Sequence, residues 1–149
     1  MDMHKIQLVQ KLITEKVPVA GFMGLDVQVA ESGHVRLRLP FSDRVKNHLD
    51  IVYAGAMFAL AEIAGGVAML SVFEDGECTI LARRIEIDYA RPSRRDLWCD
   101  LQLPDALIAE ARASVAAEGK ADVTVPIEVT DERGRVIARV VAFYYLRGK

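Results

Sequence analysis

The sequence predicts an α+β domain in which an antiparallel sheet wraps one buried helix. The span from Ile51 to Phe73 is apolar, rich in Ala and Gly, and carries one formal charge, Glu62. On both sides of this span the apolar residues recur with the period of two that is typical of half-buried strands. With 149 residues, 52% of them hydrophobic and 27% charged, the chain can bury one core but not two. We therefore expect a single domain over residues 1–149.

The chain before the apolar span predicts a short helix and then a hairpin. Three apolar residues recur at helical spacing: Ile6, Val9 and Ile13. Pro18 ends their pattern. Period-two alternation follows on both sides of a turn at residues 32–33. Its apolar positions are Leu25, Val27, Val29, Val35, Leu37 and Leu39.

The apolar span itself predicts a core helix that ends near Phe73, because residues 74–77 have the composition of a turn. Roughly 20 apolar residues would also suffice to cross a membrane. However, an acid in mid-span is costly there, and strands rather than a second apolar run follow. Gly65 and Gly66 predict a helix packed closely on the sheet, since small residues let two backbones approach.

Strands dominate the rest of the chain, with one helical insertion. One strand is expected to place four residues on one face: Leu81, Ile85, Ile87 and Tyr89. The next does the same with Leu97, Cys99, Leu101 and Leu103. Pro104-Asp105 predicts an N-cap, and Gly119 the C-cap, of a short helix. A hairpin with its turn at residues 131–134 completes the chain, and Pro126 predicts a bulge or an outward-facing edge position in its first strand.

Composition excludes several classes of function. Nineteen Lys and Arg against 21 Asp and Glu give no global attraction to nucleic acid. The N-terminus has acids, amides and lysines where a signal peptide needs an apolar segment, so we expect cytoplasmic residence. Cys78 and Cys99 are too few for a disulfide framework or a zinc site, and no His pair has metal-ligand spacing. We therefore expect no metal site.

The window from Asn47 to Glu62 reads N-x5-Y-A-G-A-M-F-A-L-A-E. It resembles the hotdog-fold acyl-CoA thioesterases, most closely the phenylacetate-catabolism-type branch, whose pattern is N-x5-H-G-G-A-x-F-x-L-x-D or E. The order of elements resembles that family along nearly the whole chain, and the insertion at residues 105–119 resembles a subgroup of thioesterases whose substrate is poorly defined. The resemblance implies a hotdog fold and hydrolysis of an acyl-CoA thioester, with no cofactor beyond the CoA of the substrate.

The resemblance also implies a role for each matching residue. Asn47 matches the Asn proposed to orient the thioester or the water, although Asn also favours turns for local reasons. Ala54 and Gly55 match the two glycines at the helix start, and Glu62 matches the acidic base or nucleophile. Tyr53 stands where the family has His. We expect a core residue at the start of the helix rather than an acid catalyst, because the ordinary pKa of tyrosine leaves its hydroxyl a hydrogen-bond donor at neutral pH.

Physical chemistry is consistent with these roles. The N–H groups at a helix N-terminus suit the oxyanion that forms when a thioester carbonyl is attacked. A buried, isolated Glu62 is either hydrogen-bonded for structure or kept for chemistry. Gly55 and Glu62 are separated along one helix by on the order of 10 Å. Two antiparallel helices across a two-fold axis would close this gap, so we expect a homodimer or a dimer of dimers with shared sites.

A basic run after Tyr89 contains Arg91, Arg94 and Arg95. Hotdog enzymes that resemble this chain often hold the nucleotide near this strand end, and the arginine fork suits phosphate oxygens. The resemblance therefore implies that these arginines bind the phosphates of CoA. The alternative is a solvated turn.

Three other functions remain open from the sequence. A non-hydrolytic acyl-CoA or acyl-carrier binding module is favoured by the missing His. A hotdog dehydratase is disfavoured for the same reason, because such enzymes pair a His with an acid. A structural interaction domain would require the space between Glu62 and the facing helix start to be filled. The sequence leaves the acyl group undetermined.

Overall fold

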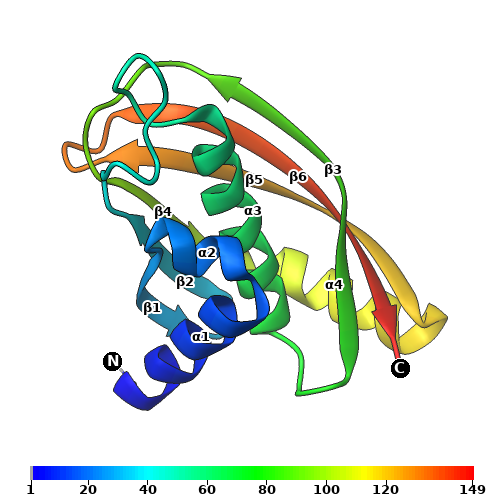
Figure 1. The fold of residues 1–149 in the computed structure, drawn as a ribbon. Helices are drawn as coiled ribbons and strands as arrows, with labels where there is room; N and C mark the ends of the chain where they lie inside the picture. Colours follow the sequence, from blue (N-terminus) through cyan, green and yellow to red (C-terminus); the bar gives the residue numbers. More distant parts are fainter. Residues whose placement is uncertain (1) are drawn as a thin grey trace.

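The computed structural model describes residues 2–149 and has an antiparallel six-stranded sheet that curves around one helix (Figure 1). The helices are α1 (Met3–Lys16), α2 (Pro18–Met23), α3 (Ala54–Leu70) and α4 (Asp105–Glu118). The strands are β1 (Asp26–Glu31), β2 (His34–Leu39), β3 (Cys78–Tyr89), β4 (Leu97–Gln102), β5 (Lys120–Asp131) and β6 (Val136–Gly148). Their order in the sheet is β1-β2-β4-β5-β6-β3. This confirms the predicted α+β class and the sheet wrapped around a central helix.

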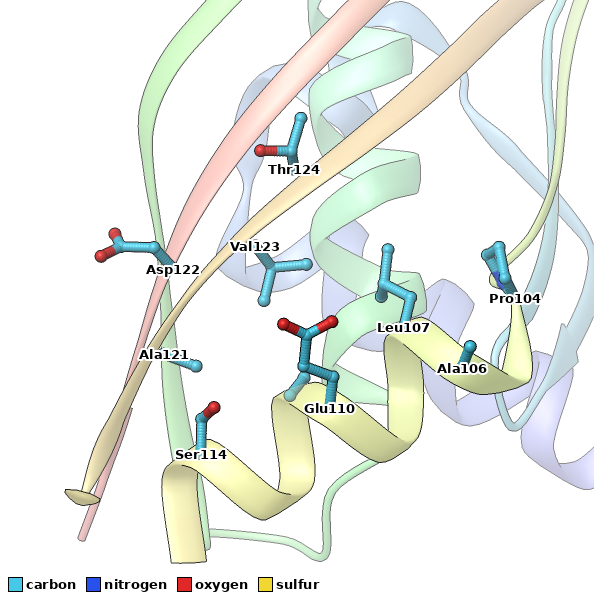
Figure 2. A pocket seen from close by; sticks show the side chains of 10 residues that line it. Pro104, Ala106, Leu107, Glu110, Ser114, Ala121, Asp122, Val123 and Thr124 are labelled. Atoms are coloured by element: carbon cyan, nitrogen blue, oxygen red, sulfur yellow. The ribbon is translucent and has the colours of Figure 1, made fainter. Parts of the chain in front are cut away.

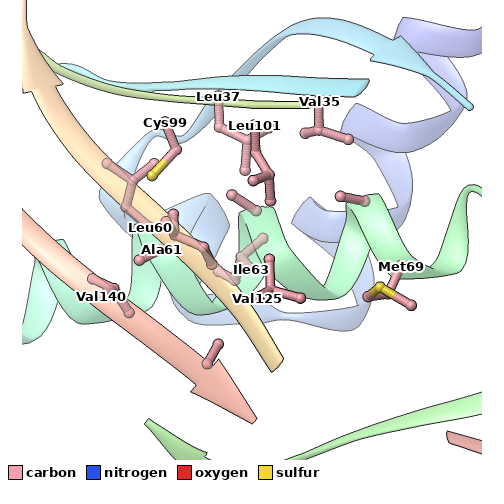
Figure 3. Close-up of a cluster of buried hydrophobic side chains, with 14 of the residues drawn as sticks. Val35, Leu37, Leu60, Ala61, Ile63, Met69, Cys99, Leu101, Val125 and Val140 are labelled. Carbon is pink, nitrogen blue, oxygen red and sulfur yellow. The ribbon is translucent and has the colours of Figure 1, made fainter. Parts of the chain in front are cut away.

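The core lies between α3 and the concave face of the sheet (Figure 3). Leu60, Ala61, Ala64 and Ala68 follow helical spacing and have no exposed surface. Residues from β2, β4, β5 and β6 face them, among them Leu37, Cys99, Leu101, Val125 and Val140. The apolar span was therefore interpreted correctly as a core helix, although the helix ends at Leu70 and a turn covers the last residues of the span.

The N-terminal region contains a second helix that the sequence analysis did not predict. The Asp2 side chain caps α1, and α1 ends before Pro18 as expected. Pro18 then occupies the first position of α2, where its missing N–H removes no helical hydrogen bond. Gly24, with φ of 74°, ends α2 in the left-handed region that favours glycine.

A β-bulge corrects the predicted face of β3. The register shifts between Ala82 and Arg84, so that Leu81 lies opposite Tyr145 while Ile85 lies opposite the buried Ala142. Because one extra residue reverses the alternation of a strand, Leu81 points to the outer face and is 54% exposed. The prediction of a shared face is therefore wrong for Leu81.

A second bulge has the same effect in β1. Its register shifts between Val27 and Val29, and Val29 becomes only half-buried. Ala30 takes the inward position opposite Val35 and is 4% exposed. The hairpin itself is confirmed, with Gly33 at φ of 73° in its turn.

The C-terminal elements follow the prediction closely. The inward residues of β5 are all buried: Val123, Val125, Ile127 and Val129. β5 pairs with β4 only at its end, through Asp131 and Thr130, so Pro126 lies at an open edge where a missing N–H is tolerated. Gly119 caps α4 as predicted, but Pro104 occupies the N-cap without a side-chain bond and Asp105 lies in the first turn.

Candidate active site

The start of α3 is held in place from several sides while its first N–H groups stay open. The Tyr53 N–H donates to the Val45 carbonyl at 2.7 Å, and the Tyr89 hydroxyl donates to the Ala54 carbonyl at 3.0 Å. No side chain caps the helix, and within residues 2–149 no acceptor is paired with the N–H groups of Ala54 and Gly55. A fixed helix N-terminus with open donors can stabilise an anion that develops beside it.

Tyr53 lies over this helix start rather than in the core. Its side chain is 56% exposed, so the expectation of a core residue at this position is wrong. A Cβ added at Gly55 would lie 2.4 Å from Cε1 of the Tyr53 ring, so the ring packs directly on Gly55. The Tyr53 ring therefore forms one wall beside the open N–H groups.

Glu62 lies on the open side of α3, in an apolar groove of about 290 Å³ between α1, α3 and β3. Burial raises the pKa of its carboxyl group. Within residues 2–149 the carboxylate has no hydrogen-bond or ion-pair partner. The nearby Tyr144 hydroxyl donates to the backbone oxygen of Glu62 at 2.9 Å and not to its side chain. A purely structural acid would be hydrogen-bonded, so this arrangement favours a carboxylate kept for chemistry.

One chain does not bring Glu62 to the open N–H groups. Ala54 and Gly55 begin α3, and Glu62 lies two turns further along the same helix, on the order of 10 Å away. The expected base and the expected oxyanion donors therefore lie on the same helix, but they are too far apart to form one site within a single chain.

Asn47 organises the loop that leads into α3. Its Oδ1 accepts from the backbone N–H of Leu49 at 2.9 Å and of Ile51 at 3.4 Å. Its own N–H donates to the Ile51 carbonyl at 2.9 Å. The oxygen of the side chain is thus occupied by the loop, as the local interpretation of this Asn predicts, while the amide NH₂ has no partner among residues 2–149.

The arginine loop lies next to the helix start because the Val52 N–H donates to the Ser93 carbonyl at 2.8 Å. Arg94 and Arg95 line a hollow of about 220 Å³, and Arg135 from the neighbouring hairpin joins them. Arg91 does not line this hollow. Sequence reasoning missed Arg135 because only the fold places its hairpin beside the loop.

These three arginines have different partners. Arg95 pairs with Glu132, and Arg135 pairs with Asp131 at 2.7 Å. Arg94 reaches only the carbonyl of Leu49, at 3.3 Å. Arg94 is therefore the guanidinium of this hollow that has no carboxylate partner within the described chain.

A separate hollow of about 470 Å³ lies between α4 and β5 (Figure 2). Glu110 projects from α4 toward β5, while Asp122 is paired with Arg83 at 2.8 Å. This hollow shares no lining residue with the Glu62 groove. Residues 2–149 contain no group of three metal-ligating side chains, and none of their helices is long and apolar enough to span a membrane.

Comparison with known proteins places the chain among thioesterase-like domains. Residues 6–146 match the family model described as a domain of unknown function, DUF4442. A Pseudomonas aeruginosa protein of unknown function, described as a probable thioesterase, superposes with a TM-score of 0.88 and is 32% identical over 96% of this chain and 95% of its own. A candidate esterase of Halobacterium salinarum is 29% identical over 76% of this chain and 79% of its own length.

The fold also matches the E. coli PaaI protein from the phenylacetic acid degradation operon. The TM-score is 0.73 at 19% identity, over 97% of this chain and 95% of the other. At this identity the likeness concerns the fold. The hotdog fold expected from the sequence is thereby confirmed.

Proposed function

From the premise that this chain belongs to the DUF4442 family and has the hotdog fold, we propose that it is a thioesterase that hydrolyses acyl-CoA thioesters to a free acid and CoA. The observation that carries the proposal is the half-buried Glu62 carboxylate, which lacks any partner within residues 2–149 and lines an apolar groove. The relatives named as a probable thioesterase and a candidate esterase support a hydrolase in general.

In the proposed reaction the thioester carbonyl oxygen is received by the N–H groups of Ala54 and Gly55. Glu62 of the partner subunit accepts a proton from water, whose oxygen attacks the carbonyl carbon, or the carboxylate attacks that carbon directly. The tetrahedral oxyanion is stabilised at the helix start, and its collapse breaks the C–S bond; CoA leaves as the thiol after its sulfur takes the proton held by Glu62 or one from solvent. In the direct attack the product of this collapse is a mixed anhydride of Glu62 and the acyl group, which water then hydrolyses to release the free acid and restore the carboxylate. The raised pKa of Glu62 makes its carboxylate a stronger base than an exposed one.

A shared site requires a homodimer or a dimer of dimers. Two copies of α3 that run antiparallel across a two-fold axis would bring each Glu62 to the other helix start and form two equivalent sites. Half-exposed apolar residues on this side of the chain, such as Phe58 at 40% and Leu70 at 44%, favour such a contact. A monomer in sedimentation that hydrolyses its substrate at the full rate would exclude the shared site.

Asn47 and Tyr53 are proposed to shape the site rather than to transfer protons. Asn47 fixes the loop before the helix with its Oδ1. The Tyr53 ring packs on Gly55 and leaves the phenol near the proposed thioester position, where its hydroxyl can donate or accept a hydrogen bond.

The basic loop, residues 91–95, is proposed to hold the phosphates of CoA, with Arg94 as the available guanidinium, Arg95 in the same hollow and Arg91 at the start of the loop outside it. Arg94→Ala should raise KM for an acyl-CoA several-fold and leave turnover of the matching acyl-pantetheine unchanged. The contact with the nucleotide stabilises the bound substrate and the transition state equally, and acyl-pantetheine has no nucleotide to lose. Arg112→Ala, on the exposed side of α4, is the matched control and should change neither. An equal loss on both substrates would instead show a role in the fold.

The experiment that tests the function is a screen of acyl-CoA thioesters with free-thiol detection, repeated with Glu62→Gln. Gln keeps the shape of the side chain and removes its basicity, so kcat should fall by roughly 100-fold or more. Thermal stability should be unchanged or raised, because a desolvated carboxylate has gone. Glu110→Gln, which lies in the other hollow, is the matched control and should hydrolyse at the wild-type rate.

A non-hydrolytic acyl-CoA or acyl-carrier binding module is the second candidate, because Tyr53 stands where the resembling family has His. In that case the wild-type protein would bind acyl-CoA without releasing thiol, and Glu62→Gln would bind as well as the wild type. Near wild-type hydrolysis by Glu62→Gln would also overturn the catalytic assignment.

A further inference from the structure

We infer that Tyr89 is a positioning residue for the proposed reaction, and that its hydroxyl sets the direction and the strength of the Gly55 N–H as a hydrogen-bond donor. The Tyr89 hydroxyl donates to the Ala54 carbonyl at 3.0 Å. This inference rests on the proposed function, which assigns the oxyanion to the N–H groups of Ala54 and Gly55. Tyr89 acts through the peptide group between these two residues and touches no reacting atom.

One peptide group carries both the acceptor of this bond and the donor to the oxyanion. The Ala54 carbonyl and the Gly55 N–H belong to the same planar peptide, which points them in opposite directions. A bond that fixes the carbonyl oxygen therefore fixes the direction of the N–H as well. It also polarises the amide and strengthens the N–H as a donor by roughly 10–30%.

The backbone of Tyr89 is itself held by the sheet. Tyr89 lies at the end of β3, opposite Ala138 in the ladder with β6. Directly after it, the N–H groups of Ala90 and Arg91 donate to the Ile137 carbonyl at 2.9 and 3.2 Å. The hydroxyl therefore reaches the start of α3 from a strand end whose own position is fixed. Because the bond lies within one chain, it does not depend on what covers α3.

Burial within the chain does not explain why a tyrosine stands here. The Tyr89 side chain is 42% exposed, whereas Tyr144, whose hydroxyl donates to the Glu62 backbone of the same helix, is 1% exposed. Tyr144 fills the core, so the contact that distinguishes Tyr89 is its hydrogen bond. Partial burial and the nearby Tyr53 phenol raise the pKa of Tyr89, so its hydroxyl keeps its proton at neutral pH and stays a donor.

The effect should be larger in the transition state than in the bound substrate. A neutral thioester carbonyl gains less from a directed donor than the oxyanion, which concentrates negative charge on the same oxygen. Loss of a whole oxyanion donor costs about 10²–10³ in kcat. Tyr89→Phe leaves the Gly55 N–H in place but less firmly directed and less polarised. For the acyl-CoA that is hydrolysed best, kcat should therefore fall by about tenfold while KM stays within about twofold.

A spectroscopic test measures the donor directly and needs no hydrolysis. Acetyl- and octanoyl-carba(dethia)-CoA have a methylene in place of the sulfur, so the carbonyl stays and no thiol can leave. With the carbonyl carbon isotopically labelled, infrared difference spectra of the bound analogue report the strength of the hydrogen bonds to its oxygen. In the wild type we expect a carbonyl stretch at lower wavenumber than for the free analogue in water, because donors fixed inside a protein bind more strongly.

Two changes at position 89 should move this stretch in opposite directions. Tyr89→Phe removes the donor to the Ala54 carbonyl and should shift the stretch to higher wavenumber. Replacement of Tyr89 by 3-fluorotyrosine makes the phenol a stronger donor, so the stretch should shift to lower wavenumber and kcat should not fall. Tyr145→Phe, on the other face of β6, is the matched control and should change neither the stretch nor kcat.

The stretch decides the inference. A stretch that does not move in Tyr89→Phe would overturn it, whatever happens to kcat or to thermal stability. Shifts of the same sign in both changes at position 89 would also overturn it, since a disturbed fold and not donor strength would then be the cause.

The outcome for the proposed function is read separately. A wild-type stretch equal to that in water, or no binding of either analogue, would overturn the role of Tyr89 even in a protein that hydrolyses acyl-CoA. Conversely, a low wild-type stretch that responds to Tyr89→Phe, in a protein that hydrolyses no acyl-CoA, would refute the proposed function and leave the role of Tyr89 standing.

Discussion

The two sides of α3 differ although the residues along them are similar. Gly65 and Gly66 are adjacent, yet a Cβ at Gly65 would lie 2.1 Å from the Tyr144 hydroxyl oxygen, while a Cβ at Gly66 would touch nothing within 4 Å outside the helix. Gly65 serves the contact with the sheet, and Gly66 leaves space in the groove. The prediction that both glycines pack closely on the sheet is right for the first and wrong for the second.

Glu62 contacts both sides of α3, one through its backbone and the other through its side chain. Its backbone oxygen accepts the buried Tyr144 hydroxyl at 2.9 Å, while its carboxylate lies in the open groove. The closed side therefore fixes the backbone of the residue whose side chain is proposed to react.

Gly65→Ala should have the largest effect on stability. The new methyl group overlaps the Tyr144 hydroxyl and breaks its hydrogen bond, so the free energy of unfolding should fall by about 2–3 kcal/mol. Gly66→Ala is the matched control and should raise it by up to about 1 kcal/mol. Urea denaturation of both variants measures the difference. If the two variants were equally stable, the contrast between the two sides of α3 would not hold.

Tyr144→Phe removes only the hydroxyl from the closed side. Loss of one buried hydrogen bond should lower the free energy of unfolding by about 1 kcal/mol. The neighbouring Tyr145 lies half-buried on the other face of β6, so Tyr145→Phe should change it by less than about 0.5 kcal/mol. A larger loss for Tyr145→Phe than for Tyr144→Phe would contradict the assignment of the bond to Glu62.

The smallest expected effect is the pH dependence on the open side. Because burial raises the pKa of Glu62 above its ordinary value of 4.5, the folded chain binds this proton more tightly than the unfolded chain does. Stability from this group is therefore complete below the ordinary value and is lost as pH rises through the raised pKa. Over that window Glu62→Gln should gain stability relative to the wild type, as urea denaturation at a series of pH values would show. A constant difference across the window would argue against the shift.

Activity should follow the same titration in the opposite direction. As pH rises through the raised pKa the carboxylate forms, so kcat of the wild type should increase along one acidic limb. A limb centred at or below 4.5 would mean that Glu62 is not desolvated in the working enzyme.

Local patterns predicted most of the elements, and the errors have a common cause. The hairpins and the insertion helix follow from alternation, glycine turns and capping, which are properties of neighbours in the chain. Leu81 and Val29 were assigned to the wrong face because a bulge adds one residue to a strand, and the partner strand decides where that happens. Pro18 ends one helix and begins another because the tertiary packing of α2 adds to a weak local preference.

By itself the sequence determined the central helix, the isolated acid in its middle and the resemblance that gives the window from Asn47 to Glu62 a meaning. Those depend on residue type and spacing along one element. Only the tertiary structure decided that the Tyr53 ring covers the helix start and that the Tyr89 hydroxyl donates to the Ala54 carbonyl. It also decided that Arg135 lies beside the basic loop and that Gly66 faces an open groove. Except for the Tyr53 ring, which packs on Gly55 two residues further along the chain, each of these is a contact, or a lack of contact, between residues far apart in the chain, and such distances are set by the way the sheet closes around α3.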